Sequence, residues 1–197
     1  ENWTEFTSAV LPDELDAPEF YYMAVFPYED YYVGLLPPYR NATSSSMDVQ
    51  LASSRDGDHW QRPVQRDTFI PIGNIGQFDS HIIWVGSGPV TVGDELWFYY
   101  GGMNVHHDWW LGLANEGIDV PESRDKTISR DGHHLCLATM RLDGYVSLDA
   151  TVRAGWIETK PIFSTGDHLY INGRCGPDGY IEVEIMDSWN NVWDDFS

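Results

Sequence analysis

Basic side chains are scarce in this sequence. Its 197 residues include 11 lysines and arginines against 31 aspartates and glutamates, for a formal net charge of -20. A phosphate-binding surface needs clustered lysine and arginine, and because the sequence holds no such cluster, it argues against nucleic acid as a partner. It argues against an anionic membrane surface for the same reason. The acidity is compatible with calcium or with a saline extracellular setting.

Long apolar runs and a signal peptide are also missing. No apolar stretch approaches the length that spans a bilayer. The sequence starts with Glu1, without the basic and apolar regions of a signal peptide. We therefore interpret it as a processed protein or as part of a longer polypeptide.

Cysteine is limited to Cys136 and Cys175. The two form one disulfide in an oxidising compartment, or they remain as two buried thiols, and the sequence leaves both alternatives open. Two N-x-T sequons, at Asn2 and Asn41, lie in polar settings suited to glycosylation of a secreted protein. Together these features favour an extracellular location.

Motifs of common catalytic and metal sites are absent. The sequence has no G-x-S-x-G, no phosphate loop, no zinc-type Cys/His spacing and no dinucleotide fingerprint. Residues 106–108 (His-His-Asp) with His81 come nearest to a metal site, but adjacent histidines on a strand point to opposite faces. Asp56 and Asp58 lack the repeated oxygen ligands of an EF-hand loop. We predict no metal site and no cofactor, with calcium as the remaining candidate.

Helical periodicity is nearly absent as well, and short apolar runs rich in aromatic and β-branched residues take its place. Glycine, proline or aspartate bounds each run, which is typical of strands. The expected strands are residues 20–27, 31–36, 48–53, 81–86, 95–100, 109–114, 135–141, 145–150, 156–163, 168–173 and 180–187. Along 180–187, glutamates alternate with isoleucine and valine, which is typical of a half-exposed strand of a sandwich-like sheet.

The turn Ser54-Arg55-Asp56-Gly57-Asp58-His59-Trp60 is the most specific local feature. Asp56-Gly57 supplies the positive φ of a tight hairpin, the aspartate accepts hydrogen bonds from turn amides, and Trp60 can fold back over the sheet. A similar S-R-D-G occurs at 129–132. The two halves repeat loosely at an offset of roughly sixty residues, and a repeat of several antiparallel strands suggests propeller blades.

Two stretches, DVQLASSRDGDHW to GDELWFYYGG and HLCLATMRLDGYVSLDA to GYIEVEIMD, carry a resemblance to a known family. The sequence resembles the C-terminal part of a five-bladed β-propeller glycosidase-like protein of the fructosidase and arabinanase superfamily. The resemblance implies an all-β fold, with antiparallel propeller-blade-like sheets followed by a partial β-sandwich. It implies a blade-like region at 1–132, and a last-blade strand with a sandwich-like region at 133–197. The family's first blade, which carries one of its three carboxylates, has no counterpart here.

Four side chains stand near the central funnel if 20–27 and 81–86 are innermost strands. These candidate catalytic residues are Asp16, Glu19, Asp79 and His81. Paired carboxylates there would serve as general acid and stabiliser in glycoside hydrolysis. The alternative is that they are solvated acids at loop ends. Candidate sugar-stacking residues are Trp60, Trp84, Trp109 and Trp110.

Two functions remain open at this stage. The first is an extracellular carbohydrate-active or glycan-binding protein of the propeller glycosidase type, which acts on glycans with incomplete catalytic machinery or only binds them. The second is a secreted, glycosylated structural or assembly protein without catalysis. In that case exposed strand edges would pair between copies into a homo-oligomer or filament.

Overall fold

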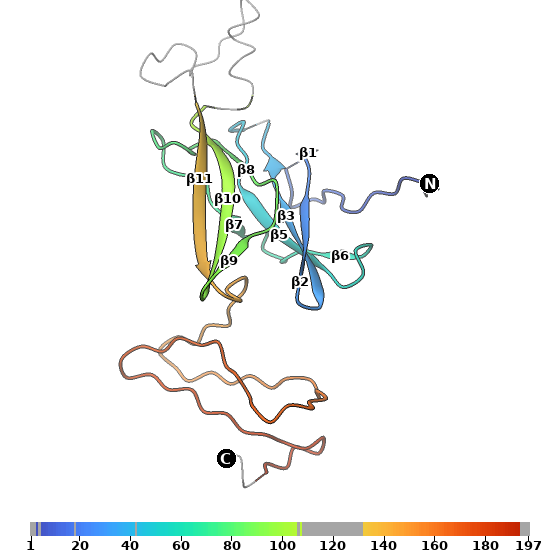
Figure 1. Cartoon of the computed structure of the whole chain (residues 1–197), viewed down its shortest axis with the longest axis vertical. Coiled ribbons are helices and arrows are strands. Elements are labelled where there is room, and N and C mark those ends of the chain that lie inside the picture. The colour runs from blue at the N-terminus through green and yellow to red at the C-terminus, as the bar shows by residue number, and fades with distance from the viewer. Residues whose placement is uncertain are drawn as a thin grey trace, which may run out of the picture. The chain divides into compact units, whose positions relative to one another are not determined.

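The computed structural model describes residues 3, 5–17, 19–41, 43–105, 107 and 132–193 (Figure 1). The described residues form strands and no helix, and all pairs of named strands are antiparallel. The predicted all-β class is therefore confirmed. The protein divides into two units, Glu1–Leu142 and Asp143–Ser197.

The first sheet of unit 1 is an antiparallel meander in the order β2-β3-β5-β6, with β7 also paired to β5. Its strands are β2 (Ala24–Tyr28), β3 (Tyr31–Leu36), β5 (Val49–Ser54), β6 (Trp60–Gln61) and β7 (Thr68–Ile70). The predicted hairpin of 20–27 with 31–36 is present as β2 and β3. Glu29 in its turn has a φ of 49°.

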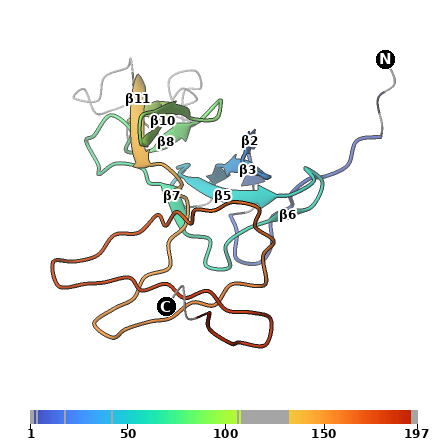
Figure 2. The same cartoon turned by 60° about the horizontal axis from the view of Figure 1, so that its bottom comes forward.

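The second sheet has the order β8-β10-β11, and β9 pairs with the first part of β10. Its strands are β8 (Ile82–Trp84), β9 (Val90–Val92), β10 (Glu95–Met103) and β11 (His133–Arg141). Figure 2 shows β8, β10 and β11 grouped beside the strands of the first sheet. β11 pairs with β10 along its whole length and lies in unit 1, which extends to Leu142.

A short row of strands joins the second sheet to the N-terminal part of the sequence. β1 (Glu19–Phe20) pairs with β4 (Pro38–Tyr39), Tyr39 pairs with Met47, and Met47 pairs with Ile82 of β8. A buried cluster accompanies this row, formed by Tyr39, Met47, Ile82, Met103 and Val105. The residues of β1, β4 and β8 are therefore close to one another in the folded protein.

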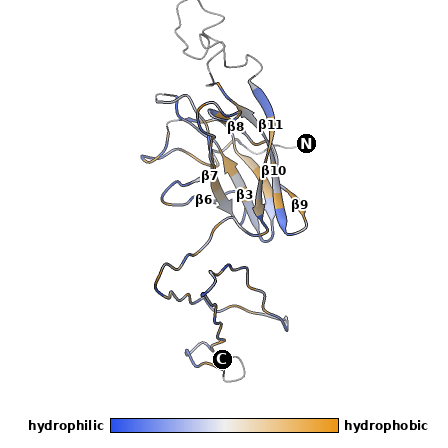
Figure 3. Ribbon diagram, turned by 90° about the vertical axis from the view of Figure 1, so that its left-hand side faces the viewer, coloured by the Kyte–Doolittle hydropathy of each residue, from blue (hydrophilic) through white to orange (hydrophobic). Residues whose placement is uncertain are grey.

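The remaining core fills the space between the two sheets. Hydrophobic residues recur along the strands of both (Figure 3). Phe26 and Leu35 of the first sheet and Leu96 and Phe98 of the second are all buried. The rings of Phe69 and Phe98 meet edge to face, with centroids 5.6 Å apart.

The turn at 54–60 has the predicted geometry. The amides of Asp58 and His59 donate to Asp56 Oδ1 at 2.9 and 2.7 Å, and Gly57 has a φ of 84°. The Trp60 Nε1–H donates to the Gly57 carbonyl at 2.8 Å, so the indole folds back over the sheet. A Cβ on Gly34 of β3 would lie 3.0 Å from Trp60 Cζ3. The same Cβ would lie 2.6 Å from Met23 Sδ, so the glycine lets both side chains pack closely on β3.

Residues 143–193 differ from the expectation. No strand forms within this range, and the pairing found there is one isolated bridge between Met186 and Val192. The strands expected at 145–150, 156–163, 168–173 and 180–187 are therefore not formed within this range. The physical reason is that an alternating apolar pattern makes a strand only when its apolar face has a surface to cover. The expected strand at 109–114 lies outside the described residues.

Candidate functional site

The candidate catalytic residue Asp16 is held in a buried ion pair. Its carboxylate accepts two hydrogen bonds from Arg62, both of 2.6 Å, and Arg62 also donates to Gln50 of β5. Burial alone would raise the pKa of Asp16, but the Arg62 hydrogen bond, the Asp13 amide and the charges of Arg62 and Arg66 outweigh it and lower that pKa. The carboxylate thus stays ionised, and its hydrogen bonds commit it to a structural role.

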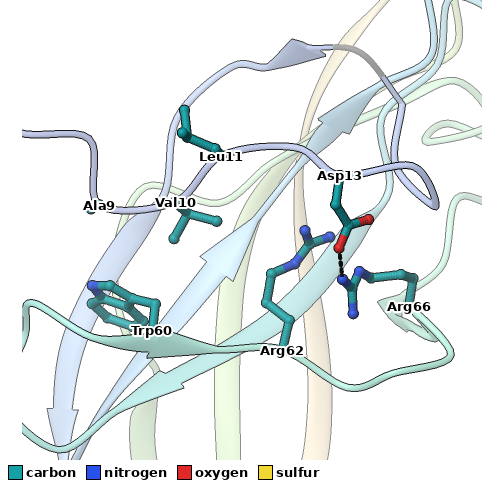
Figure 4. Close-up of a pocket in the computed structure, with 7 residues that line it drawn as sticks. All are labelled: Ala9, Val10, Leu11, Asp13, Trp60, Arg62 and Arg66. Carbon is teal, nitrogen blue, oxygen red and sulfur yellow. Dashed lines mark hydrogen bonds and ion pairs between the residues drawn. The ribbon is translucent and has the colours of Figure 1, made fainter.

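A pocket of about 230 Å³ lies beside this ion pair. It is lined by Ala9, Val10, Leu11, Asp13, Trp60, Arg62 and Arg66. Figure 4 shows Val10 next to the Trp60 ring and the Asp13 carboxylate paired with Arg66. Since Trp60 also packs on Gly34, its indole has the contacts of the structural residue that the turn motif predicts.

Asp79 is buried at the start of β8. Its carboxylate accepts a 2.6 Å hydrogen bond from the Tyr100 hydroxyl, and its carbonyl accepts the Gly73 amide at 3.1 Å. Burial and the Asp79 contact raise the pKa of Tyr100, and burial raises the pKa of Cys136 beside it. Both groups therefore stay protonated near neutral pH, and Tyr100 remains a donor that fixes the Asp79 carboxylate.

The other two candidate catalytic residues lie apart from each other. His81 is built into the backbone row, because its amide donates to Met103 and its carbonyl accepts from Met47. Glu19 is exposed on β1 and accepts a 3.4 Å hydrogen bond from Asn41 Nδ2. Three strand spacings of about 4.8 Å, roughly 14 Å along the sheet, separate the backbone at Glu19 from β8. The carboxylates of Glu19 and Asp79 have separate hydrogen-bond partners, Asn41 for Glu19 and Tyr100 for Asp79.

The same row carries a set of rings that we term the aromatic cluster: Tyr21, Tyr22, Tyr39, Trp84 and His107. The Tyr21 ring lies 5.5 Å from Tyr39, 5.6 Å from Trp84 and 4.9 Å from His107, and the Tyr22 ring stacks on Trp84 at 5.8 Å. Sequence reasoning singled out Trp84 and missed the tyrosines. The adjacent pair Tyr21-Tyr22 was the available signal.

Hydrogen bonds hold these rings in place. The Tyr21 hydroxyl is bonded to His107 Nε2 at 2.7 Å, the Val85 amide donates to the Tyr22 hydroxyl at 2.7 Å, and Trp84 Nε1–H donates to Met103 Sδ at 3.2 Å. Tyr39 is buried beneath, whereas Tyr21 is 43% exposed. The arrangement presents a partly exposed Tyr21 packed against Tyr39, Trp84 and His107.

The other predicted site residues have the following places. Both cysteines are free thiols here, Cys136 buried in β11 of unit 1 and Cys175 exposed in unit 2, and a disulfide between them stays a prediction. Trp109, Trp110 and Asn2 lie outside the described residues. Within the described ranges, no three His, Cys, Asp or Glu side chains gather as a metal site would require, and no helix there has the length and hydropathy to cross a membrane.

The comparisons with known proteins find little. No family model and no curated protein matches this sequence. Among solved structures, it is similar to a protein from a complex named for BT0996 and RGII, with 17% identity and a TM-score of 0.38. The match covers 48% of the present protein and 29% of the other. A likeness of this size assigns neither a fold nor a function.

Proposed function

We propose that this protein binds glycans at the aromatic cluster, without hydrolysing them there. The observation that carries the proposal is the partly exposed Tyr21 ring, fixed against Trp84 and His107. Sugar-binding surfaces use aromatic rings for the apolar face of the sugar and a few fixed polar groups for its hydroxyls. Sites for small ligands in general combine apolar walls with a few placed polar groups.

The absence of a carboxylate pair among the described candidates supports binding rather than hydrolysis. The Asp16 carboxylate accepts two hydrogen bonds from Arg62, and the Asp79 carboxylate accepts one from Tyr100. A general acid must exchange its proton with the substrate, and a carboxylate buried in an ion pair or held by a tyrosine hydroxyl is poorly placed for that step. Glu19 is exposed on β1, opposite Tyr39 of the cluster in the strand pairing, and is available to accept a hydrogen bond from a sugar hydroxyl.

Replacing Tyr21 tests the proposal. Tyr21→Ala removes the exposed ring and is expected to weaken the affinity for a glycan from a broad panel about tenfold, which corresponds to about 1.4 kcal/mol. Tyr21→Phe keeps the ring and removes the hydroxyl that bonds His107, so it should weaken binding less. Calorimetric titration of each variant measures these affinities.

Trp156→Ala is the matched control, since Trp156 is 83% exposed and lies outside unit 1. It should bind as the unchanged protein does. Trp84 is not replaced, because it packs against the buried cluster and its loss would disturb the fold. Failure of the unchanged protein to bind any glycan of the panel, or full affinity in Tyr21→Ala, would refute the proposal.

A second candidate function, self-assembly, is favoured by the edge of β11. Among the described strands β11 pairs with β10 alone, through nine residues without a register shift. Leu135 and Leu137 are 84% and 42% exposed, and no acidic residue occurs in the strand. Long, regular apolar edges favour pairing with a strand of another molecule. Because this edge carries no carboxylate, two copies would not bring carboxylates together there.

A lysine on this edge tests the assembly. If copies pair through β11, light scattering shows an oligomer, and Leu137→Lys shifts it to the monomer because a charged edge side chain opposes strand pairing. Val25→Lys, at an exposed position on β2, is the control and should leave the oligomer unchanged. A monomeric unchanged protein would rule out this candidate.

A further inference from the structure

The loop between β4 and Met47 is closed by its own backbone. The amides of Thr43, Ser44 and Ser45 all donate to the Arg40 carbonyl, at 3.3, 3.2 and 2.9 Å. The Arg40 amide in turn donates to the Ser46 carbonyl at 3.0 Å. Because these backbone groups hydrogen-bond to one another, the loop does not depend on the side chains of Asn41 or Thr43 for its shape.

Both functional residues of the sequon in this loop point outward. Asn41 and Thr43 are exposed, whereas Ser46 and Met47, which follow them, are buried. Asn41 Nδ2 donates a 3.4 Å hydrogen bond to Glu19, itself exposed. Long, exposed bonds of this kind contribute little to stability, so the amide nitrogen can be modified at small cost.

We propose that Asn41 carries an N-linked glycan. Asn41 Nδ2 forms a bond to the anomeric carbon of an oligosaccharide supplied as a lipid-linked diphosphate. The bond from that carbon to the diphosphate breaks, the lipid diphosphate leaves with the bonding electrons, and the amide gives up one proton. This inference is independent of glycan binding by the aromatic cluster, since it concerns a sugar attached to the protein itself.

The fold accommodates such a modification at this position. The exposed residues Asn41 and Thr43 are not part of the buried cluster around Met47. Modification of Asn41 would break its hydrogen bond to Glu19. Asparagine acceptors of this motif lie on surface loops, and Asn41 is exposed on such a loop. A glycan there would add polar bulk beside β1 and β4.

The test is peptide mapping of the protein secreted from a eukaryotic host behind a cleavable leader. The peptide containing residue 41 should carry a hexosamine-based glycan, and enzymatic removal should convert Asn41 to aspartate. Asn41→Gln and Thr43→Ala should abolish the modified peptide. Thr43→Ser should keep it, because serine also completes the motif.

Asn74→Gln is the matched control, since Asn74 is exposed but lies in no sequon. It should leave the glycan at position 41 unchanged. Mapping by peptide separates this site from the sequon at Asn2. A folded, secreted protein whose residue 41 is unmodified would overturn the inference, as would a glycan at residue 41 that survives in Thr43→Ala.

Discussion

The Asp16 carboxylate and the Arg62 guanidinium form a buried ion pair that ties the N-terminal segment to the first sheet. The Asp16 side chain is fully buried and the Arg62 side chain is 7% exposed. Arg62 also reaches Gln50 of β5, so the pair joins the N-terminal segment, the residues after β6 and the sheet. Removing one partner of a buried pair leaves the other charge without compensation, which is a large destabilisation.

Asp16→Asn is therefore expected to lower the free energy of unfolding by about 3 to 5 kcal/mol. Asp13→Asn is the control, because Asp13 is half exposed in its pair with Arg66, and it should cost about 1 kcal/mol or less. Denaturant unfolding at neutral pH measures both values. Equal losses in the two variants would contradict the buried character of the Asp16 pair.

The pH dependence of stability follows from the same carboxylate. The pKa of Asp16 is lower in the folded protein than its ordinary value of 3.8. The stability that it contributes is therefore complete above that ordinary value and is lost as the pH falls through the lower folded pKa. Unfolding curves between neutral and acidic pH should show this loss in the unchanged protein, and a smaller loss in Asp16→Asn.

At the scale of elements, the turn between β8 and β9 packs on β2. A Cβ on Gly88 would lie 2.6 to 2.9 Å from three atoms of Phe26, a buried ring of the first sheet. A Cβ on Gly86, in the same turn, would meet nothing within 4 Å. The contact at Gly88 therefore joins the two sheets at close approach.

Gly88→Ala should destabilise unit 1 by about 1 to 3 kcal/mol, because the ring of Phe26 has to shift within a packed core. Gly86→Ala is the matched control and should be neutral or slightly stabilising, since alanine restricts the unfolded state. Thermal unfolding followed by circular dichroism distinguishes the two. A destabilised Gly86→Ala together with an unaffected Gly88→Ala would contradict the packing described.

At the scale of the whole molecule, residues 143–193 lack a core of their own. Nearly all of their side chains are exposed, including Trp156, Phe163 and Trp189. Their backbone makes few hydrogen bonds, for example between Asp187 and Asn191 and between Trp193 and Ile185. Segments with few buried contacts and few internal hydrogen bonds open at little cost in free energy.

Hydrogen exchange should therefore separate the two units. Amides of peptides from 143–193 are expected to exchange fast, while those of β10, paired on both sides over parts of its length, stay protected. Mass spectrometry of the quenched peptides measures both. Protection of 180–187 equal to that of β10 would show that this segment is paired as a strand in solution.

Local signals were sufficient for much of unit 1. The hairpin of β2 and β3 and the Asp56-Gly57 turn with Trp60 folded over the sheet follow from alternation and turn chemistry within a few residues. The same signals failed at 145–187. There the apolar alternation is present, but a strand also requires a paired neighbour, and a local pattern does not supply one.

The order of residues by itself determined the all-β class, the acidic charge and the strands β2, β3, β5, β8, β10 and β11 of unit 1, because these depend on composition and on neighbours in the sequence. Only the tertiary structure decided what the candidate acids do. Asp16 meets Arg62 across 46 positions, and Tyr21 meets His107 across 86. Contacts at such separations depend on how the sheets pack, so no local pattern could show that the acids are committed to structural partners or that the aromatic cluster forms.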